Sequence, residues 1–272
     1  MSTTVLLEGL SFGEGPRWHD GALWFSDFYR HGVFRLTGDG EELVVEVPTQ
    51  PSGLGWMPNG DLLIVSMTDR KLLRRGADGT LREHADVGSV AEGHCNDMVV
   101  AVDGTAYVGN FGPNRAPATL AIVSPDGEVR AGPSDMHFAN GTVITPDGST
   151  LIIGETMAGR LSAFTIEPSG DLVDRRTWAD LSGGIPDGIC LDEAGGIWVA
   201  DPRNANCFRV TEGGEITQRI DLELNCFACM LGGDDGRTLY LITAPTSGEK
   251  AAATRNGRIE SIQVDIPRAG LP

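Results

Sequence analysis

A short signature recurs along this chain at intervals of 39 to 47 residues. In each copy a polar residue precedes a short apolar run, then a turn that contains glycine, then a second apolar run. The turn glycines of the copies are Gly21, Gly60, Gly104, Gly148, Gly195 and Gly236. Repeats of this length are typical of the blades of β-propellers. The signature therefore predicts a ring of six similar units that takes up nearly the whole chain.

The apolar runs within each copy are short and rich in Val, Ile, Leu, Trp and Tyr, which is typical of strands. Asn-Gly, Asp-Gly or Gly-Gly pairs between the runs supply the positive φ that tight hairpins need. The fourth copy predicts strands over 141–145, 150–154 and 160–166 and a fourth strand around 175–178. No stretch has a long apolar period of 3.6, so a helical fold is not supported. An open β-sandwich has no reason to repeat at this spacing.

The two ends of the chain are predicted to share one blade. The last copy has no outer strand of its own, because the chain ends soon after the run 257–264. Residues 4–10 have strand character and no partner in the first blade, so the N-terminal strand is expected to close the last blade and remove free edges. The prediction is an all-β, six-bladed β-propeller with four-stranded antiparallel blades, forming a single domain over 1–272.

Charge and cysteine content narrow the classes of partner. The formal net charge of −17 and pI near 4.6 oppose binding to nucleic acid or to an anionic membrane, because phosphate contacts need clustered Lys and Arg. The first residues show neither a secretion signal nor a membrane anchor. Five cysteines, an odd number, do not form a disulfide framework, so a cytoplasmic location is expected. Cys226 and Cys229 could form a metal or redox pair, but burial as small hydrophobic residues is favoured.

Oxygen-bearing side chains stand at the heads of five copies. In a propeller the innermost strands line a central channel, so these heads should converge at one end of it. Two carboxylates with amide oxygens suit a hard divalent cation, Ca²⁺ before Zn²⁺, Mn²⁺ or Mg²⁺. The simpler alternative is that Asn-Gly and Asp-Gly pairs are only turn residues. The hairpin turns come later in their copies, however, which favours a site formed by Glu14, Ser52, Asn96, Asn140 and Asp187.

Several of these heads also carry a family resemblance. The chain resembles the SMP-30/gluconolactonase/luciferin-regenerating enzyme family through Glu14-Gly-Pro-Arg-Trp, Asn96-Asp, Phe138-Ala-Asn140-Gly and Ile185-Pro-Asp187-Gly-Ile. The resemblance implies a six-bladed propeller and a divalent cation, usually calcium, held by Glu14, Asn140 and Asp187. It also implies Asn96 as a further ligand or substrate contact. The implied activity is hydrolysis of a lactone, commonly a sugar lactone.

His94 departs from the pattern of that family. Many of its sugar lactonases carry Arg two residues before the channel Asn, and here that position is His94. His94 and Asn96 are two apart in a predicted strand, so both should face the channel and contact substrate, while Cys95 and Asp97 face away. An imidazole lacks the bidentate fork that suits a polyhydroxylated substrate. Arg115, in a loop predicted at the channel mouth, is a candidate replacement.

The leading hypothesis is a metal-dependent, gluconolactonase-like hydrolase that opens a small-molecule lactone. The cation would act as Lewis acid, and either a carboxylate, Asp187, or a metal-bound water would supply the nucleophile. One alternative is a phosphotriester or other ester hydrolase on the same site. Another is a non-catalytic binding propeller that the metal stabilises, because fold alone does not assign function. A condensation of the strictosidine-synthase-like type is disfavoured by the acidic pair, Glu14 and Asp187.

Overall fold

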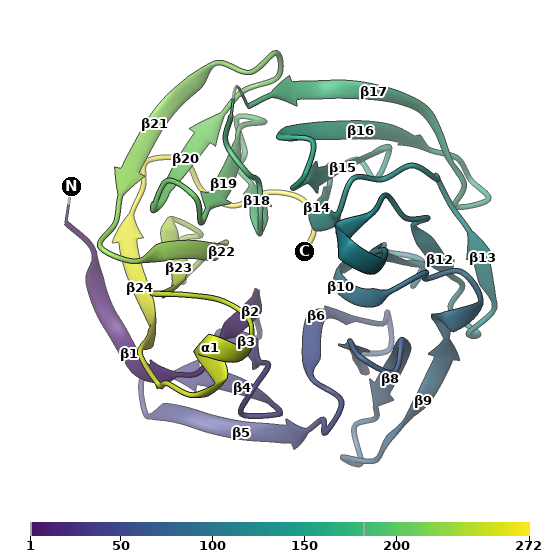
Figure 1. The fold of residues 1–272 in the computed structure, drawn as a ribbon, viewed down its shortest axis with the longest axis horizontal. Coiled ribbons are helices and arrows are strands. Elements are labelled where there is room, and N and C mark those ends of the chain that lie inside the picture. The colour runs from purple at the N-terminus through teal and green to yellow at the C-terminus, as the bar shows by residue number, and fades with distance from the viewer. Residues whose placement is uncertain (1, 182) are drawn as a thin grey trace.

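Antiparallel sheets arranged around a central axis make up the structure, which is a computed structural model describing residues 2–181 and 183–272. The described residues form six four-stranded sheets. In Figure 1 the sheets surround the axis as blades, with one strand of each blade nearest the centre. The predicted six-bladed β-propeller is confirmed. None of the helices in the described part of the chain is long and apolar enough to cross a membrane.

The first three blades follow one another along the chain, each from its inner strand outward. The first consists of β2 (Gly13–His19), β3 (Ala22–Asp27), β4 (Gly32–Thr37) and β5 (Gly40–Glu46). The second consists of β6 (Pro51–Trp56), β7 (Leu62–Ser66), β8 (Lys71–Arg75) and β9 (Leu81–Asp86). The third consists of β10 (His94–Val100), β11 (Ala106–Phe111), β12 (Ala121–Val123) and β13 (Val129–Ala131). Short 3-10 turns lie at Val87–Ser89 and Pro113–Arg115.

The last three blades continue the same order. The fourth consists of β14 (Ala139–Ile144), β15 (Thr150–Glu155), β16 (Arg160–Ile166) and β17 (Leu172–Asp180). The fifth consists of β18 (Ile189–Leu191), β19 (Ile197–Asp201), β20 (Asn206–Val210) and β21 (Ile216–Asp221). The sixth contains β22 (Asn225–Gly232), β23 (Thr238–Ala244) and β24 (Gly257–Gln263), with the short helix α1 (Glu249–Ala252) between β23 and β24.

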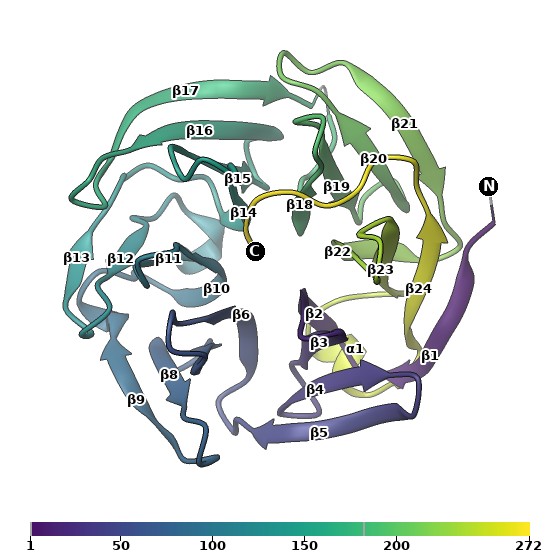
Figure 2. The ribbon, with the colours of Figure 1, turned by 180° about the vertical axis from the view of Figure 1, so that it is seen from behind.

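The N-terminal strand closes the ring, as the sequence predicted. Strand β1 (Thr4–Leu10) pairs antiparallel with β24, with Thr4 opposite Ser261 and Leu10 opposite Gly257. The sixth blade is therefore built from both ends of the chain. The C-terminal segment then runs toward the centre of the ring on the face that Figure 2 shows, where Leu271 pairs with Ile144. The sequence analysis did not foresee this path.

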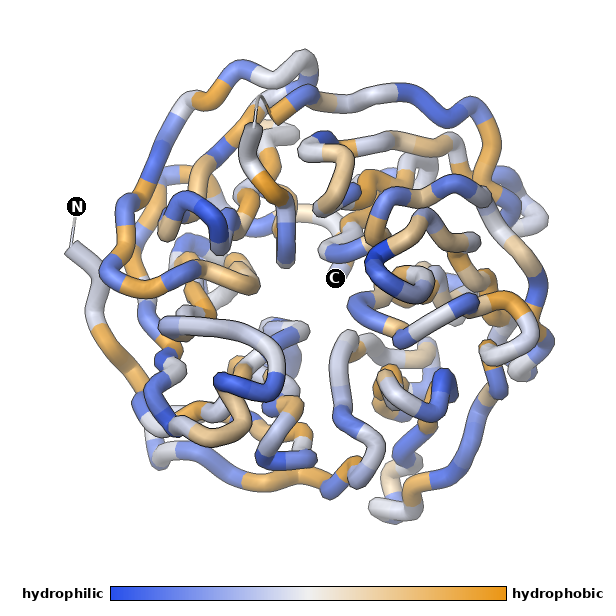
Figure 3. Tube along the Cα trace, in the orientation of Figure 1, coloured by the Kyte–Doolittle hydropathy of each residue, from blue (hydrophilic) through white to orange (hydrophobic). Residues whose placement is uncertain are grey.

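The place of a strand in its blade decides whether its residues are buried or exposed. Inner and middle strands such as β7 and β19 are buried along their whole length, whereas outer strands such as β5 and β21 are mostly exposed. Figure 3 shows hydrophilic and hydrophobic residues interspersed along the outer strands. The core therefore lies between neighbouring blades, because each blade covers the face of the next.

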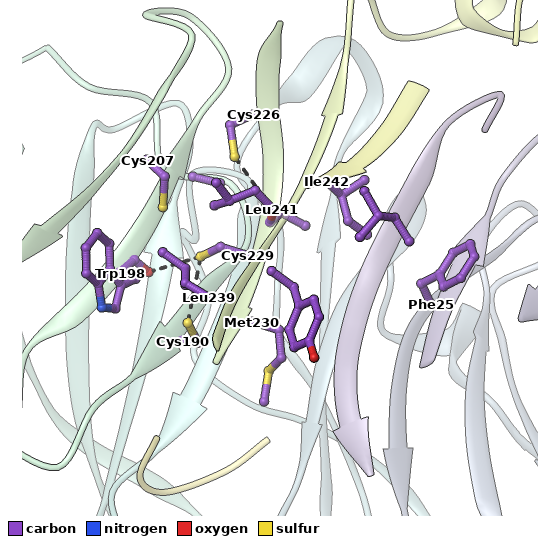
Figure 4. Close-up of a cluster of buried hydrophobic side chains, with 14 of the residues drawn as sticks. Phe25, Cys190, Trp198, Cys207, Cys226, Cys229, Met230, Leu239, Leu241 and Ile242 are labelled. Carbon is purple, nitrogen blue, oxygen red and sulfur yellow. Dashed lines mark hydrogen bonds between the residues drawn. The ribbon is translucent and has the colours of Figure 1, made fainter. Parts of the chain in front are cut away.

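The cysteines are part of this core. All five are free and buried, as the sequence analysis favoured. Four of them meet between the fifth and sixth blades beside Trp198 (Figure 4), and Cys190 Sγ lies 3.9 Å from Cys229 Sγ. Burial raises the pKa of the Cys95 thiol to about 12, because the charged thiolate is poorly solvated there. These thiols fill space between blades as small apolar groups do.

Close approach of the inner strands explains a second glycine in the repeat. A Cβ on Gly141 would lie 2.6 Å from the backbone oxygen of Asp187, in the next blade. A Cβ on Gly53 would lie 2.5 Å from the backbone nitrogen of Met98. The Ser-Gly and Asn-Gly pairs at the blade heads are therefore not hairpin turns. Their glycines let neighbouring inner strands touch, and the residue before each glycine stands at the channel.

Candidate active site in the central channel

The heads of the inner strands open onto a cavity of about 670 Å³ at one end of the channel. Five residues predicted from the sequence line this cavity together: Glu14, His94, Asn96, Asn140 and Asp187. Strand β2 supplies the first, β10 the next two and β14 the fourth, while Asp187 precedes β18. These strands belong to four different blades. The structure thus brings the predicted residues to one place, although they are spread over more than 170 positions of the chain.

Ser52 lies at an equivalent head but has a different place. Its side chain is buried, and it is not among the described residues that line the cavity. The Ser52 hydroxyl donates a hydrogen bond to Asn96 Oδ1 at 3.4 Å. The expectation that Ser52 shares the site is therefore corrected. Ser52 contacts the Asn96 amide instead of lining the cavity.

Irregular pairing within the blades turns the head residues toward the axis. The register between inner and second strands shifts between Glu14 and Arg17, and again between Ala139 and Thr142. A similar shift lies between Cys95 and Met98, next to Asn96. Such bulges bend a strand and re-aim side chains, and they are frequent beside active sites. The bulges therefore turn these side chains toward the cavity.

Glu14 and Asp187 are carboxyl groups held in an environment that disfavours their charge. Burial raises the pKa of Glu14 well above its usual value, and the charges of Asp187 and Asp97 raise it further. Burial likewise raises the pKa of Asp187 to about 8. Among the described residues, neither carboxyl group forms an ion pair with Lys, Arg or His. Two acids with no cationic side chain beside them form a site that is short of positive charge.

Asn140 is held in place by hydrogen bonds across two blades. Its Nδ2 donates to Thr156 Oγ1 at 3.1 Å, and the Thr156 hydroxyl donates to the Pro186 carbonyl at 2.7 Å. A side-chain hydrogen bond with Asn140 also lowers the pKa of Asp187, against the larger effect of burial. Thr156 itself lines the cavity. The amide of Asn140 is therefore oriented before any ligand arrives.

A buried ion pair lies under the floor of the cavity. Arg17 Nη2 is 2.5 Å from Asp97 Oδ1, and the same guanidinium donates to the carbonyls of Leu54 and Met98 at 2.9 and 2.8 Å. One side chain thus ties together the first three blades. Asp97 points away from the cavity, as the strand alternation predicted. Asp97 balances the charge of Arg17. Arg17 also lowers the pKa of Glu14, but this is the smallest of several effects on that group.

Three further polar residues, Arg115, His137 and Asp201, lie near the cavity. Arg115 lines the cavity as an exposed residue, as predicted for its loop. Among the described residues, the lining includes neither His137 nor Asp201. His137 Nε2 lies 3.6 Å from Asp135 Oδ1 on the surface. Asp201 is buried and accepts a hydrogen bond from Asn204 at 2.7 Å, and its charge contributes to the raised pKa of Asp187.

Aromatic side chains of the cavity were missed by the sequence analysis. The lining includes Phe12, Phe28, Tyr29, Phe111 and Phe227. They come from loops and strand ends of three blades and follow no common spacing. A signal was nevertheless present, because Phe138 directly precedes the Ala139-Asn140 pair and Phe111 closes the strand that faces His94.

A second cavity of about 630 Å³ lies between turns of the third and fourth blades, where Tyr107 and Leu271 contribute to its wall. Its acidic residues are engaged locally. Asp103 accepts a hydrogen bond from the Thr105 backbone, and Asp147 accepts one from the Ser149 backbone. The hydrogen bonds of Asp147 hold its pKa down at about 2. These carboxylates are turn residues, so the candidate site is the channel cavity.

The donor chemistry of the channel fits a hard cation. Within residues 2–181 and 183–272, no group of three or more His, Cys, Asp or Glu side chains could hold a metal ion. The predicted set contains two carboxyl groups and two amides, which is an all-oxygen set of the kind that calcium accepts and zinc does not prefer. The shortage of positive charge around Glu14 and Asp187 also fits a site for a cation.

Comparison with known proteins shows the family to which the chain belongs. The family model described as the SMP-30/Gluconolactonase/LRE-like region matches residues 12–245. A pentonolactonase from Haloferax volcanii is 25% identical, with 99% of this chain and 96% of that protein covered. A 6-deoxy-6-sulfogluconolactonase from Pseudomonas putida is also 25% identical, with 96% of this chain and 94% of that protein covered.

Solved structures show the same fold. A regucalcin from Agrobacterium tumefaciens, described as a calcium-binding protein, superposes with a TM-score of 0.85 at 21% identity. The superposition covers 100% of this chain and 96% of the regucalcin chain. Because the family model matches residues 12–245, which is most of the chain, the chain belongs to the SMP-30/gluconolactonase/LRE-like family.

Proposed function

We propose that this chain is a lactonase, organised as a single domain over residues 1–272, that opens a small-molecule lactone by hydrolysis. The family membership supports this proposal, together with the two lactonases that match along almost their whole length. The observation that supports it most is the pair of carboxyl groups on the floor of the channel cavity, the buried Glu14 and the half-buried Asp187. A hydrolase needs a proton acceptor and charge stabilisation at one place; a carboxylate would supply the first, and a cation held by these carboxylates would supply the second.

The residues proposed to hold a divalent cation are Glu14, Asn140 and Asp187, with Asn96 as a further ligand or substrate contact. Burial and mutual repulsion disfavour two negative charges on the floor, and a cation would supply the missing positive charge. Calcium is the cation that best suits this oxygen set, and Mg²⁺, Mn²⁺ and Zn²⁺ are the alternatives to test. When bound, such a cation polarises a carbonyl group as a Lewis acid.

Asp187 is the proposed general base. It is less completely buried than Asn140 and faces the cavity, so a water molecule can reach it. A cation bound beside Asp187 would favour its ionised form despite the raised pKa, and this carboxylate takes a proton from the water that adds to the lactone carbonyl carbon. The bond between that carbon and the ring oxygen then breaks, and the proton passes to the leaving oxygen. The product is a hydroxy acid, and Asp187 returns to its starting state.

His94 and Asn96 are proposed to orient the substrate. Both line the cavity, with Asn96 buried near the floor and His94 exposed at the mouth. The Ser52 hydroxyl holds the Asn96 amide, which lowers the entropy cost of positioning a substrate against it. His94 can donate or accept a hydrogen bond but cannot form the two parallel bonds of a guanidinium.

Substitution of Asp187 tests the proposal. Asp187→Asn keeps the shape of the side chain and removes its basicity, so kcat for γ-butyrolactone should fall by about 100-fold or more. Glu249→Gln is the matched control, because Glu249 is an exposed carboxylate at the rim of the same cavity. It should stay within about threefold of wild type. A folded Asp187→Asn protein with more than a tenth of the wild-type rate would contradict the role of Asp187. Wild-type protein without hydrolysis of any lactone would favour a non-catalytic propeller.

A further inference from the structure

Aromatic side chains are concentrated at the mouth of the channel cavity. The chain contains nine phenylalanines, and five of them line this one cavity together with Tyr29. Aromatic residues make up only 6% of the sequence, so they are enriched here. The five are Phe12, Phe28, Phe111, Phe138 and Phe227. They form two groups that belong to different blades.

The first group, called the Phe138 wall, consists of His94, Phe111 and Phe138. The rings of Phe111 and Phe138 lie with centroids 4.3 Å apart and are inclined by 39°. The His94 ring meets Phe111 edge-on at 5.9 Å. Both phenylalanines are half-buried, so part of each ring faces the cavity.

The second group, called the Phe12 wall, consists of Phe12, Phe28, Tyr29 and Phe227. Phe12 contacts Phe227 at 4.8 Å and Phe28 at 5.2 Å between ring centroids. These residues form a small apolar cluster with Ala251 of α1. Phe12 and Phe227 are nearly buried, whereas Phe28 and Tyr29 keep exposed surface.

Phe138 holds its place at a conformational cost. Its φ is +63°, in the left-handed region that a phenylalanine rarely adopts. The Thr156 backbone donates to the Phe138 carbonyl at 3.1 Å, and the Phe138 backbone donates to the Met136 carbonyl at 3.0 Å. Glycine would satisfy these bonds without strain. The backbone therefore does not require the ring, and strained residues of this kind cluster at ligand sites.

The charged side chains around the mouth are placed differently from these rings. Arg115 and Arg203 line the cavity but are both exposed, so they are solvated at its rim. Buried hydrogen-bonding side chains of the cavity, such as Asn96 and Asn140, lie at the floor with the carboxyl groups. The lining between rim and floor also includes Gln50, Asn225 and Thr246, but its largest side chains are aromatic, from the third and fourth blades in one group and from the first and sixth in the other.

We infer that the substrate is a lactone that carries a flat apolar substituent, and that Phe138 is a specificity-determining residue. The substituent lies between the Phe138 wall and the Phe12 wall while the ester group reaches the floor. Aromatic rings favour stacked or edge-on contact with another ring and gain from its burial. A polyhydroxylated lactone would instead leave its hydroxyl groups against these apolar surfaces. This inference rests on the proposed lactonase activity.

The test compares γ-phenyl-γ-butyrolactone with unsubstituted γ-butyrolactone. For wild type we expect kcat/KM to be at least about tenfold higher for the phenyl compound. Phe138→Gly removes the ring and the backbone strain together, so a folded protein is retained. In this variant KM for the phenyl compound should rise about tenfold, and the ratio of kcat/KM for the phenyl compound to kcat/KM for γ-butyrolactone should fall about tenfold.

Trp56→Phe is the control, because Trp56 stacks on His19 at 3.9 Å at the opposite end of the inner strands and should not affect the ratio. If γ-butyrolactone or glucono-δ-lactone is hydrolysed as well as the phenyl compound, the inference is wrong and the lactonase proposal stands. An unchanged ratio in Phe138→Gly also overturns the role of Phe138. If no lactone is hydrolysed, the proposed function fails and the inference with it.

Discussion

Glu14 and Asp187 are acids of the cavity floor, and neither forms an ion pair with a described Lys, Arg or His. Most buried acids of this chain are satisfied: Glu155 meets Arg160 and Arg175, and these contacts hold its pKa down at about 2 despite burial. Asp97 likewise has Arg17. The channel pair has only amide and backbone donors beside it, so the pKa of each group is raised. Perturbed acids in a cavity are the expected mark of a functional site.

The raised pKa of Asp187 predicts a pH dependence for the cation-free protein. In the unfolded chain the group has an ordinary pKa near 3.8, and in the folded chain it has one of about 8. Between these values the folded state holds a proton that the unfolded state releases, so stability falls as pH rises from about 4 to about 8. Each unit of difference corresponds to about 1.4 kcal/mol. Thermal unfolding of chelator-treated protein across this range measures the effect.

The Asp187→Asn variant provides the comparison for that experiment. Because it cannot titrate at this position, its unfolding temperature should fall less over the same pH interval. Added calcium should flatten the wild-type curve, since a bound cation favours the ionised carboxylates. Parallel curves for wild type and Asp187→Asn would show that Asp187 has an ordinary pKa.

The sequence predicted some of the residues that line the site and missed others. Repeated positions gave Glu14, Asn96, Asn140 and Asp187 because each stands at the same place in its blade. Their roles as ligands, base and substrate contacts remain predictions. The aromatic walls were not predicted, because most of their members lie on loops and strand ends without a shared period and only Phe138 stands beside a repeated head position. Arg17 and Asp97 are 80 residues apart, and only the closed ring brings them into contact.

At the level of elements, the inner strands combine a bulge with a glycine that permits close contact. Gly141 illustrates the second feature, because its Cβ would meet the backbone of the fifth blade. Backbone cannot give way as a flexible side chain can. In the Asn-Gly pair of the fourth blade, packing against the next blade requires the glycine, and the cavity receives the side chain of the asparagine. Sequence patterning predicted the strand but read the glycine only as an alternative turn signal.

Two glycines of the fourth blade give a matched prediction. Gly141→Ala should destabilise the protein by about 3 kcal/mol, because the added carbon would lie 2.5 Å from the Ile189 backbone nitrogen and force the strands apart. Gly148→Ala should cost only about 1 kcal/mol, because no atom lies within 4 Å and the penalty comes from its φ of +71°. Denaturant unfolding compares them. A Gly141→Ala protein no less stable than Gly148→Ala would contradict the close packing described here.

At the level of the whole molecule, closure depends on the pairing of β1 with β24. The six-unit repeat and the lack of an outer strand in the last copy were enough to predict this pairing. The path of the C-terminal segment could not be predicted, because residues 265–272 carry no strand pattern. Its contacts, such as Arg268 donating to the Trp18 carbonyl at 2.9 Å, depend on the finished ring.

Removal of the N-terminal strand tests closure. Deletion of residues 2–10 should lower the unfolding temperature by more than about 10 °C and promote association, because β24 would become an exposed edge. Deletion of residues 2–3 alone removes no strand pairing and serves as the control. Unfolding temperature and light scattering report the two effects. A monomeric, equally stable protein without residues 2–10 would show that the ring does not need this strand.

We propose that a divalent cation held by Glu14, Asn140 and Asp187 supports lactone hydrolysis in the channel. The most direct test of this proposal is the rate of γ-butyrolactone hydrolysis by chelator-treated protein as calcium is titrated back, for wild type and Glu14→Gln side by side. Wild type should lose its activity on chelation and regain it saturably, whereas Glu14→Gln should need at least about tenfold more calcium. Full activity in the presence of chelator, or the same calcium requirement in both proteins, would contradict the proposal.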